Sequence, residues 1–359
     1  MASNEGTEHM IVIGADPHKR QHTVAAVDAA TGELLGSETV KATSAGHGDL
    51  LAWGRALSPE RVWAIEDCRH VSDRLERFLV ARSERVVRVA PKLMAGQRRS
   101  SRQAGKSDPI DATAVARAAL REGLGTLPAA ELDERALEIK LLLDHREDLV
   151  RERTAIQGLL RWHLHDLWGE DGVPVGGLDR AKWLDRLARR LARCEQTVRV
   201  RICREEVARL RMLARRSKEL EREIALLVRA HAPRLLELPG CGALTAAKLV
   251  AETAGIERFA TDARFARHAG IAPIPASSGR SDRFRLHRGG NRQLNCAIHR
   301  IAVTQGRVHP PARDYLARKQ AEGKTRIEAL RALKRHLART VWRTMIANAN
   351  APAPTLVLT

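Results

Sequence analysis

The chain has 359 residues, of which 44% are apolar and 29% charged, so it can bury cores in two or three domains. It carries 62 lysines and arginines against 43 aspartates and glutamates, a formal net charge of +19. The apolar fraction argues against a disordered chain, and the positive surplus predicts a polyanionic partner.

Cysteine and hydropathy patterns exclude several further classes of protein. The five cysteines form no CxxC pair and no close cluster with histidine, which argues against a zinc site or a disulfide framework. No segment is long and apolar enough to cross a bilayer. Aromatic residues make up only 3% of the chain, which argues against a protein that stacks single-stranded bases. We therefore expect a soluble, intracellular protein with no membrane partner.

The first 125 residues predict an α/β domain. Short β-branched and apolar runs separated by polar turns predict three strands in a meander, followed by two further strands with a helix between them. The expected strands are residues 10–16, 22–28, 33–41, 62–67 and 85–90, and the expected helix is 71–83.

Four acidic residues are placed where such a domain would bring them together. Asp16 and Glu66 each end a predicted strand, and Asp108 and Asp111 open the helical segment DPIDATAVARAAL, one turn apart. Converging carboxylates in a basic protein are typical of a site that holds two Mg²⁺ ions, with Mn²⁺ as a substitute, for phosphoryl transfer. Capping of the helix is the alternative role for the last two acids. His18 and His22, near Asp16, are interpreted as polar residues at strand ends.

Residues 131–232 predict long charged helices broken by a glycine- and proline-rich segment at 169–179. Leucine and isoleucine at three- and four-residue steps between Leu210 and Leu227 indicate a coiled-coil seam. Arg146 and Arg153 stand where the seam of the earlier helix should be apolar. The pattern fits an antiparallel hairpin within one chain and a dimerisation arm equally well.

The last third, from about residue 233 to 345, predicts a mainly helical domain. Its segment LLELPGCGALTAAKLVAET has the form of a helix-hairpin-helix, in which the amides around Gly240 and Gly242 could bind a phosphate. The alternative is an ordinary tight turn between helices.

A basic stretch follows this segment. It contains five arginines against a single acid, which suits a track of backbone phosphates, at Arg280, Arg283, Arg285, Arg288 and Arg292. Ser277 and Ser278 precede Gly279 in a stretch that Pro273 and Pro275 keep from being helical. Spacing alone indicates only turn residues for the two serines.

These residues carry a resemblance to a known family. IGADPHKRQHTVAAVD, WAIEDC and KSDPIDATAVAR resemble the three N-terminal motifs of the DEDD transposases of the bacterial insertion-sequence "one-ten" family, relatives of the Piv invertase. LPGCGALTAAKLVAE and FARHAGIAPIPASSGRSDRFRLHRGGNRQL resemble their C-terminal domain. The match spans nearly the whole chain.

The resemblance implies three domains. These are a RuvC-like, ribonuclease-H-type catalytic domain at 1–128, a coiled-coil oligomerisation arm at 129–232 and a C-terminal transposase domain at 233–359. It also implies that Asp16, Glu66, Asp108 and Asp111 bind Mg²⁺ and that Ser278, or failing that Ser277, is the nucleophile that becomes linked to DNA.

The implied function is that of a DNA transposase or recombinase acting on double-stranded donor and target DNA. A structured bridge RNA encoded by the element would carry sequence choice, and the enzyme would work as a dimer or tetramer in the bacterial cytoplasm, with the nucleoid. Two alternatives remain open. One is a metal-dependent junction-resolving nuclease that uses water as nucleophile, and the other is a non-catalytic nucleic-acid-binding protein.

Overall fold

The computed structural model describes residues 10–66, 73–91, 93–94, 108–127, 129–130, 133–169, 172–275, 284–287 and 289–350. The chain divides into two units by its internal contacts. One is formed by Met1–Asp133 with Thr253–Ala349, and the other by Glu134–Glu252 with Asn350–Thr359. The division into three domains at 128 and 232 stays a prediction.

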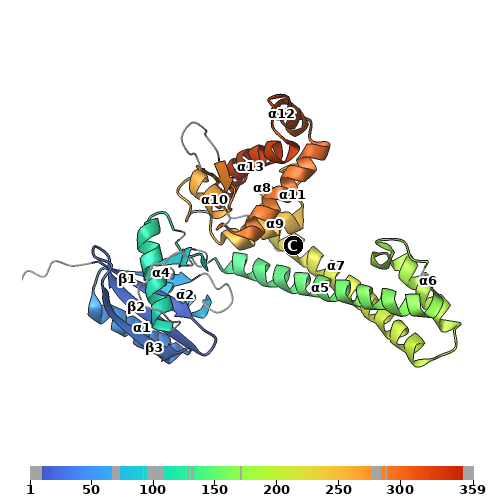
Figure 1. Cartoon of the computed structure of the whole chain (residues 1–359), viewed down its shortest axis with the longest axis horizontal. Helices are drawn as coiled ribbons and strands as arrows, with labels where there is room; N and C mark the ends of the chain where they lie inside the picture. The colour runs from blue at the N-terminus through green and yellow to red at the C-terminus, as the bar shows by residue number, and fades with distance from the viewer. Residues whose placement is uncertain are drawn as a thin grey trace, which may run out of the picture. The chain divides into compact units, whose positions relative to one another are not determined.

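A five-stranded mixed sheet forms the centre of the N-terminal segment (Figure 1). Its strand order is β3-β2-β1-β4-β5, in which β1, β2 and β3 pair antiparallel while β4 and β5 run parallel to β1. This arrangement of a meander and crossovers confirms the expected α/β domain of ribonuclease-H type. The strands are β1 (Ile11–Pro17), β2 (Gln21–Asp28), β3 (Leu34–Lys41), β4 (Arg61–Glu66) and β5 (Val86–Val89).

Helices cover both faces of this sheet. Alternate residues of the strands point to opposite faces, so each strand contributes to two cores. Ile11, Ile13 and Trp63 pack with helices α1 (Ser44–Leu57) and α2 (Asp73–Val80). Val12, Val62 and Ala64 pack instead with α4 (Asp108–Glu122). The α4 face carries the site described below.

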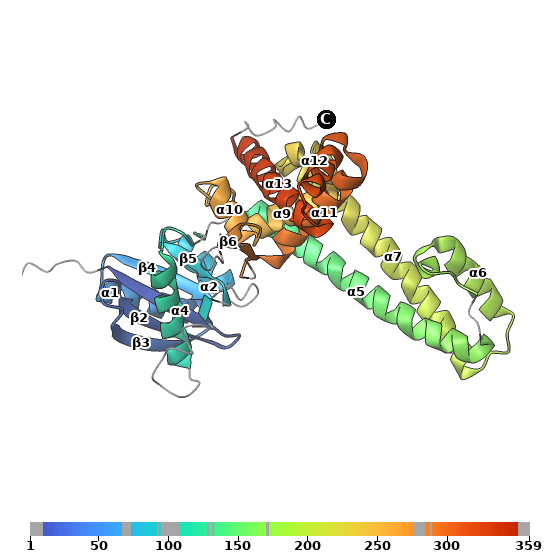
Figure 2. The ribbon, with the colours of Figure 1, turned by 45° about the horizontal axis from the view of Figure 1, so that its top comes forward.

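The second unit is built on two long helices, α5 (Glu134–Trp168) and α7 (Val198–His231), which lie side by side (Figure 2). Ion pairs join residue 146 to 221, 152 to 209 and 166 to 199, so the helices run antiparallel. Between them the chain forms the short turn η1 (Gly177–Asp179) and the amphipathic helix α6 (Ala181–Ala192).

The two arginines that interrupt the predicted seam of α5 have acidic partners. Arg146 pairs with Glu221 and Arg153 with Asp179 at 3.3 Å, while Leu210, Leu213 and other apolar residues of α7 are buried as expected. An antiparallel hairpin within one chain is confirmed. The role of this arm in oligomerisation stays a prediction.

The C-terminal segment is mainly helical, as predicted. Its helices in the second unit are α8 (Pro233–Leu236) and α9 (Ala243–Thr253). In the first unit, α10, α11 and α12 each pack against α13, and the strands β6 and β7 pair as a short antiparallel ribbon. The bounds are α10 (Asp262–His268), β6 (Pro273–Pro275), β7 (Phe284–Leu286), α11 (Arg292–Val308), α12 (Pro310–Ala321) and α13 (Arg326–Ala349).

Candidate active site

Two of the four predicted acids lie at the carboxyl edge of the sheet, on the face covered by α4. Val12, Gly14 and Asp16 alternate along β1, and Val62, Ala64 and Glu66 alternate along the neighbouring parallel strand β4. Ala15 is paired in register with Ile65, so the two acids follow at the same level of adjacent strands. Their side chains therefore leave the sheet toward the same helix.

Helix α4 supplies the other two acids. It begins at Asp108, and Asp111 lies one turn later, where its side chain is only 4% exposed. The helix approaches β1 closely because Gly14 has no side chain: a Cβ at this position would lie 2.1 Å from the carbonyl oxygen of Ala112 and 2.5 Å from the amide nitrogen of Ala116. This contact brings the first turn of α4 to the end of β1, beside Asp16.

The tightest cluster of possible metal ligands among the described residues joins Asp16, His18 and Asp108. One ligand atom from each lies within 4.8 Å of the other two. His18 Nε2 is 3.2 Å from Asp16 Oδ2 and 3.8 Å from Asp108 Oδ1. Gln21 Nε2 donates to Asp108 Oδ2 at 3.2 Å. Glu66 and Asp111 lie outside this cluster.

His18 and Gln21 are residues that sequence reasoning gave no role. His18 lies in the turn between β1 and β2 and Gln21 is the first residue of β2, and their partner Asp108 is some ninety positions further along the chain. A histidine two residues after a strand-end aspartate is the only local signal that could have indicated this.

The electrostatics of the site reflect burial first and the crowding of negative charge second. Burial raises the pKa of Asp16, which is 6% exposed, and the charges of Asp111 and Asp108 raise it further, against a lowering by His18. Carboxylates that resist ionisation because of like neighbours are relieved by a divalent cation, and carboxylate oxygens are the ligands that Mg²⁺ and Mn²⁺ prefer. The residues present therefore fit a divalent metal.

Most of the predicted nucleophile and phosphate track lies outside the described residues. This holds for Ser277, Ser278, Arg280, Arg283 and Arg288. Of the remaining two, Arg285 lies on β7, opposite Ile274 of β6, and Arg292 is the first residue of α11. Both side chains are exposed, as a phosphate contact requires.

The predicted helix-hairpin-helix turn joins α8 to α9. Gly240 has a φ of +82°, a conformation that favours glycine, and Gly242 is exposed directly before the first residue of α9. Cys241 between them is buried, which raises its pKa to about 12. The turn joins two helices, and both its assignment as a helix-hairpin-helix and phosphate binding by its amides stay predictions.

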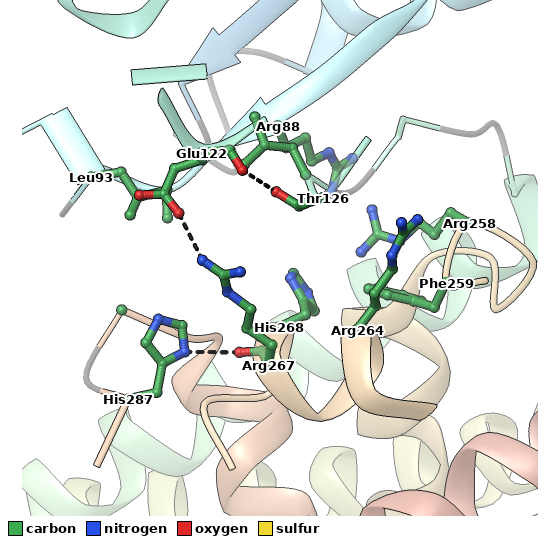
Figure 3. A pocket seen from close by; sticks show the side chains of 13 residues that line it. Arg88, Leu93, Glu122, Thr126, Arg258, Phe259, Arg264, Arg267, His268 and His287 are labelled. Carbon is green, nitrogen blue, oxygen red and sulfur yellow. Dashed lines mark hydrogen bonds and ion pairs between the residues drawn. The ribbon is translucent and has the colours of Figure 1, made fainter. Parts of the chain in front are cut away.

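A second polar region of the first unit is a small pocket rich in arginine and histidine (Figure 3). Arg267 of α10 forms an ion pair with Glu122 at the end of α4, with Nη2 and Oε2 2.7 Å apart. His287 Nδ1 donates to the backbone oxygen of Arg267 at 2.9 Å. The ion pair of Arg267 with Glu122 joins the two chain segments of the unit at this pocket.

Comparison with known proteins agrees with this geometry. A family model described as "Transposase" matches residues 13–168, and the model "Transposase IS116/IS110/IS902 family" matches residues 232–317. The "Insertion element IS110 uncharacterized 43.6 kDa protein" of Streptomyces coelicolor is 32% identical over 64% of this chain and 68% of its own length. The chain belongs to this transposase family.

Two other relatives align with almost the whole transposase. The IS116 44.8 kDa protein of Streptomyces clavuligerus is 28% identical, and the IS900 42 kDa protein of Mycobacterium paratuberculosis is 29% identical. Each alignment covers 92% of this transposase and 94% of the relative. Among solved structures, T. thermophilus RuvC in complex with Holliday junction substrate aligns with 34% of the transposase and all of its own chain, at 16% identity and a TM-score of 0.27.

Membership of this family makes the protein a DNA-cutting and rejoining enzyme of an insertion sequence. In the part of the chain that the structure describes, none of the helices is long and apolar enough to cross a membrane.

Proposed function

We propose that this transposase cuts and rejoins donor and target DNA through a serine–DNA intermediate, with Asp16, Glu66, Asp108 and Asp111 holding Mg²⁺. The observation that carries the metal site is the cluster of Asp16, His18 and Asp108 at the edge of the sheet. Glu66 and Asp111 extend it on the same face, through strand alternation and the first turn of α4. The resemblance of SSGRS to the family motif supports Ser278 as nucleophile.

The chain's own residues have separate tasks in this scheme. Two acids on neighbouring strands and two on α4 are fixed relative to each other by the close contact at Gly14. His18 and Gln21 lie against the carboxylates of Asp16 and Asp108 and orient them. When bound, Mg²⁺ stabilises the charge that develops on the phosphoryl oxygens and on the attacking and leaving oxygens.

The proposed covalent step balances as an ordinary transesterification. Ser278 Oγ forms a bond to phosphorus while the bond from phosphorus to one strand-end oxygen breaks. The serine gives up its proton, and the released strand end takes one up as a hydroxyl. Attack by a second strand end on the phosphoserine then restores Ser278 and joins the new strands.

We further propose that a structured RNA carries sequence choice and that the enzyme acts as a homo-oligomer. The net charge of +19 with few aromatic residues suits a protein that binds nucleic-acid backbones and leaves base pairing to RNA. A site composed from two protomers would unite the serine of one chain with the acids of another.

The experiment that tests this function is a covalent-adduct assay. Purified protein is incubated with Mg²⁺, the RNA transcribed from the element's flank, and donor and target DNA. We expect a protein–DNA adduct that is lost in Ser278→Ala and in Asp111→Asn but kept in Ser277→Ala. DNA cleavage without adduct, surviving in Ser278→Ala, would instead establish a nuclease that uses water. DNA binding without any metal-dependent reaction would establish a non-catalytic binding protein.

A further inference from the structure

A pocket of about 700 Å³ lies between α11 and α13 of the first unit. Ile271 and His287, which flank the β6–β7 ribbon in sequence, also line it, so it lies at the base of that ribbon. None of the described residues that line it is an aspartate or glutamate. A concave site of this size can hold a ligand group.

Four nitrogen-bearing side chains from two helices face this pocket. Arg292 and His299 come from α11, and Arg331 and Lys334 come from α13. Among the described residues, neither arginine nor Lys334 forms an ion pair with a carboxylate. No described carboxylate therefore lies within ion-pair distance of these three cations, although the charge of Glu328, three residues before Arg331 on α13, acts on Arg331.

The groups in the pocket repel one another. Burial lowers the pKa of Lys334, and the charge of Arg331 lowers it further, against an opposing effect of Cys296. Burial likewise lowers the pKa of His299, and Lys334 adds to this lowering. Like charges held together at a folding penalty are relieved when an anion binds between them.

Neutral groups hold the cations in place. Lys334 Nζ donates to Asn295 Oδ1 at 2.6 Å, and Asn295 Nδ2 donates in turn to the backbone oxygens of Ala269 at 2.9 Å and Gly270 at 3.1 Å. Gly290 packs so closely that a Cβ there would lie 2.2 Å from the amide nitrogen of Gly270. Asn295 is therefore a positioning residue for Lys334. It is anchored to a backbone segment where Gly270 and Gly290 approach too closely for a side chain at position 290.

The start of α11 adds to the positive potential. Asn291 caps this 17-residue helix, accepting hydrogen bonds from the amides of Gln293 and Leu294, and Arg292 follows at the first helical position. The positive end of the helix dipole thus faces the same region as Arg292.

We propose that this pocket binds a backbone phosphate of the DNA that the transposase recombines. The described residues that line the pocket offer cations but no Phe, Tyr or Trp side chain on which a base could stack, so the pocket suits the phosphodiester rather than the base. The inference rests on the proposed function, since it takes DNA as the ligand. It extends that function by adding Arg331, Lys334 and Asn295, from outside the arginine track.

The test compares charge-removing variants in DNA binding without metal. Lys334→Gln removes the charge but keeps a donor for Asn295, and Arg331→Gln is a second variant at an exposed position. Lys324→Gln, an exposed lysine in the same unit but outside the pocket, is the matched control. Affinity for a DNA duplex and for an RNA hairpin is measured over a range of salt concentrations in EDTA.

We expect each pocket variant to bind DNA about tenfold more weakly at physiological salt. The salt slope, which is the slope of the logarithm of affinity against the logarithm of salt concentration, should become smaller in magnitude by about one. The control should keep the wild-type slope. Wild-type slopes in both pocket variants, or a loss confined to RNA, would overturn the proposal.

Adduct formation by the wild type, measured in parallel, separates this inference from the proposed function. If adduct forms but the slopes are unchanged, only the pocket is wrong. If no adduct forms but the slopes fall, the pocket stands and the serine mechanism does not.

Discussion

The two edges of the central sheet hold buried carboxylates in opposite surroundings. At the carboxyl edge, Asp16 lies near Asp108 and Asp111. At the other edge, Glu84 accepts hydrogen bonds from Arg61, at 2.8 Å from Nε and 2.6 Å from Nη2, from Trp63 Nε1 at 3.1 Å, and from Arg55. Asp16 lies between two like charges and a single histidine, His18, whereas Glu84 is surrounded by hydrogen-bond donors.

The pKa values of the two acids move in opposite directions for this reason. Burial alone would raise the pKa of Glu84, but hydrogen bonds from Arg61 and Trp63 and the charge of Arg61 bring it below the ordinary value. The pKa of Asp16 stays raised, because burial and the neighbouring acids outweigh His18. Burial is common to both, so the identity of the neighbours separates a carboxylate that stabilises the fold from one that we propose binds a cation.

Asp16→Asn gives the largest expected effect. We expect metal-dependent adduct formation to fall by about 10³-fold or more, the scale of loss when one group that stabilises the transition state is removed. The melting temperature of the metal-free protein should stay the same or rise, because a charge repelled by Asp108 and Asp111 disappears. Activity within tenfold of wild type would place the metal elsewhere.

Glu84→Gln should show the reverse pattern. Removing the carboxylate leaves Arg61, whose side chain is 13% exposed, without its partner, and we expect unfolding in urea to be easier by roughly 3 kcal/mol. Adduct formation per folded molecule should not change. The exposed Glu60→Gln, a neighbour with the same change of charge, is the control. A stable variant with impaired catalysis would contradict the structural role.

A buried histidine pair predicts how stability depends on pH. His22 and His47, 1% and 2% exposed, lie with their Nε2 atoms 3.1 Å apart, and burial followed by the charge of His47 lowers the pKa of His22 to about 4. His22 binds a proton near pH 6.5 in the unfolded chain but only near pH 4 in the folded protein. The free energy of unfolding therefore falls by up to about 3 kcal/mol as the pH falls from 6.5 to 4.

Urea unfolding at several pH values measures this slope. His22→Gln should reduce the dependence of the free energy of unfolding on pH between pH 6.5 and 5. This window lies above 4.5, the ordinary pKa of a glutamate, so the stabilising contribution of Glu84 is still present throughout it. Some slope should remain, because burial also lowers the pKa of His47 and of His299. An unchanged slope in the variant would show that His22 does not titrate in this window.

The smallest effect is expected from His18→Ala. His18 lies between the carboxylates of Asp16 and Asp108, and loss of a residue that orients metal ligands typically weakens metal affinity by about tenfold. The Mg²⁺ concentration for half-maximal adduct formation should rise by that factor while the maximal rate is largely kept. Gln21→Ala removes a donor to Asp108 only, so it should raise this Mg²⁺ concentration by a smaller factor.

Sequence patterns predicted those parts of the site that depend on local periodicity. The strand ends at Asp16 and Glu66 and the helix start at Asp108 follow from apolar runs and their termination, and the structure confirms them. His18 and Lys334 could not be found in this way, because their neighbours come from distant segments of the chain. Lys334 lies in an ordinary amphipathic helix, and its hydrogen bond to Asn295 of α11 appears only in the structure.

The first unit is interrupted in sequence, since residues 134–252 of the second unit lie between its two segments. During synthesis the sheet leaves the ribosome first, but Arg267 and the rest of α10 to α13 follow only after the long helices have been made. A chain cut or terminated within α5 or α7 therefore contains all four acids and lacks Ser278. Such a fragment would keep the proposed metal ligands without the proposed nucleophile, so under the proposed mechanism a completed polypeptide is itself a condition for strand transfer.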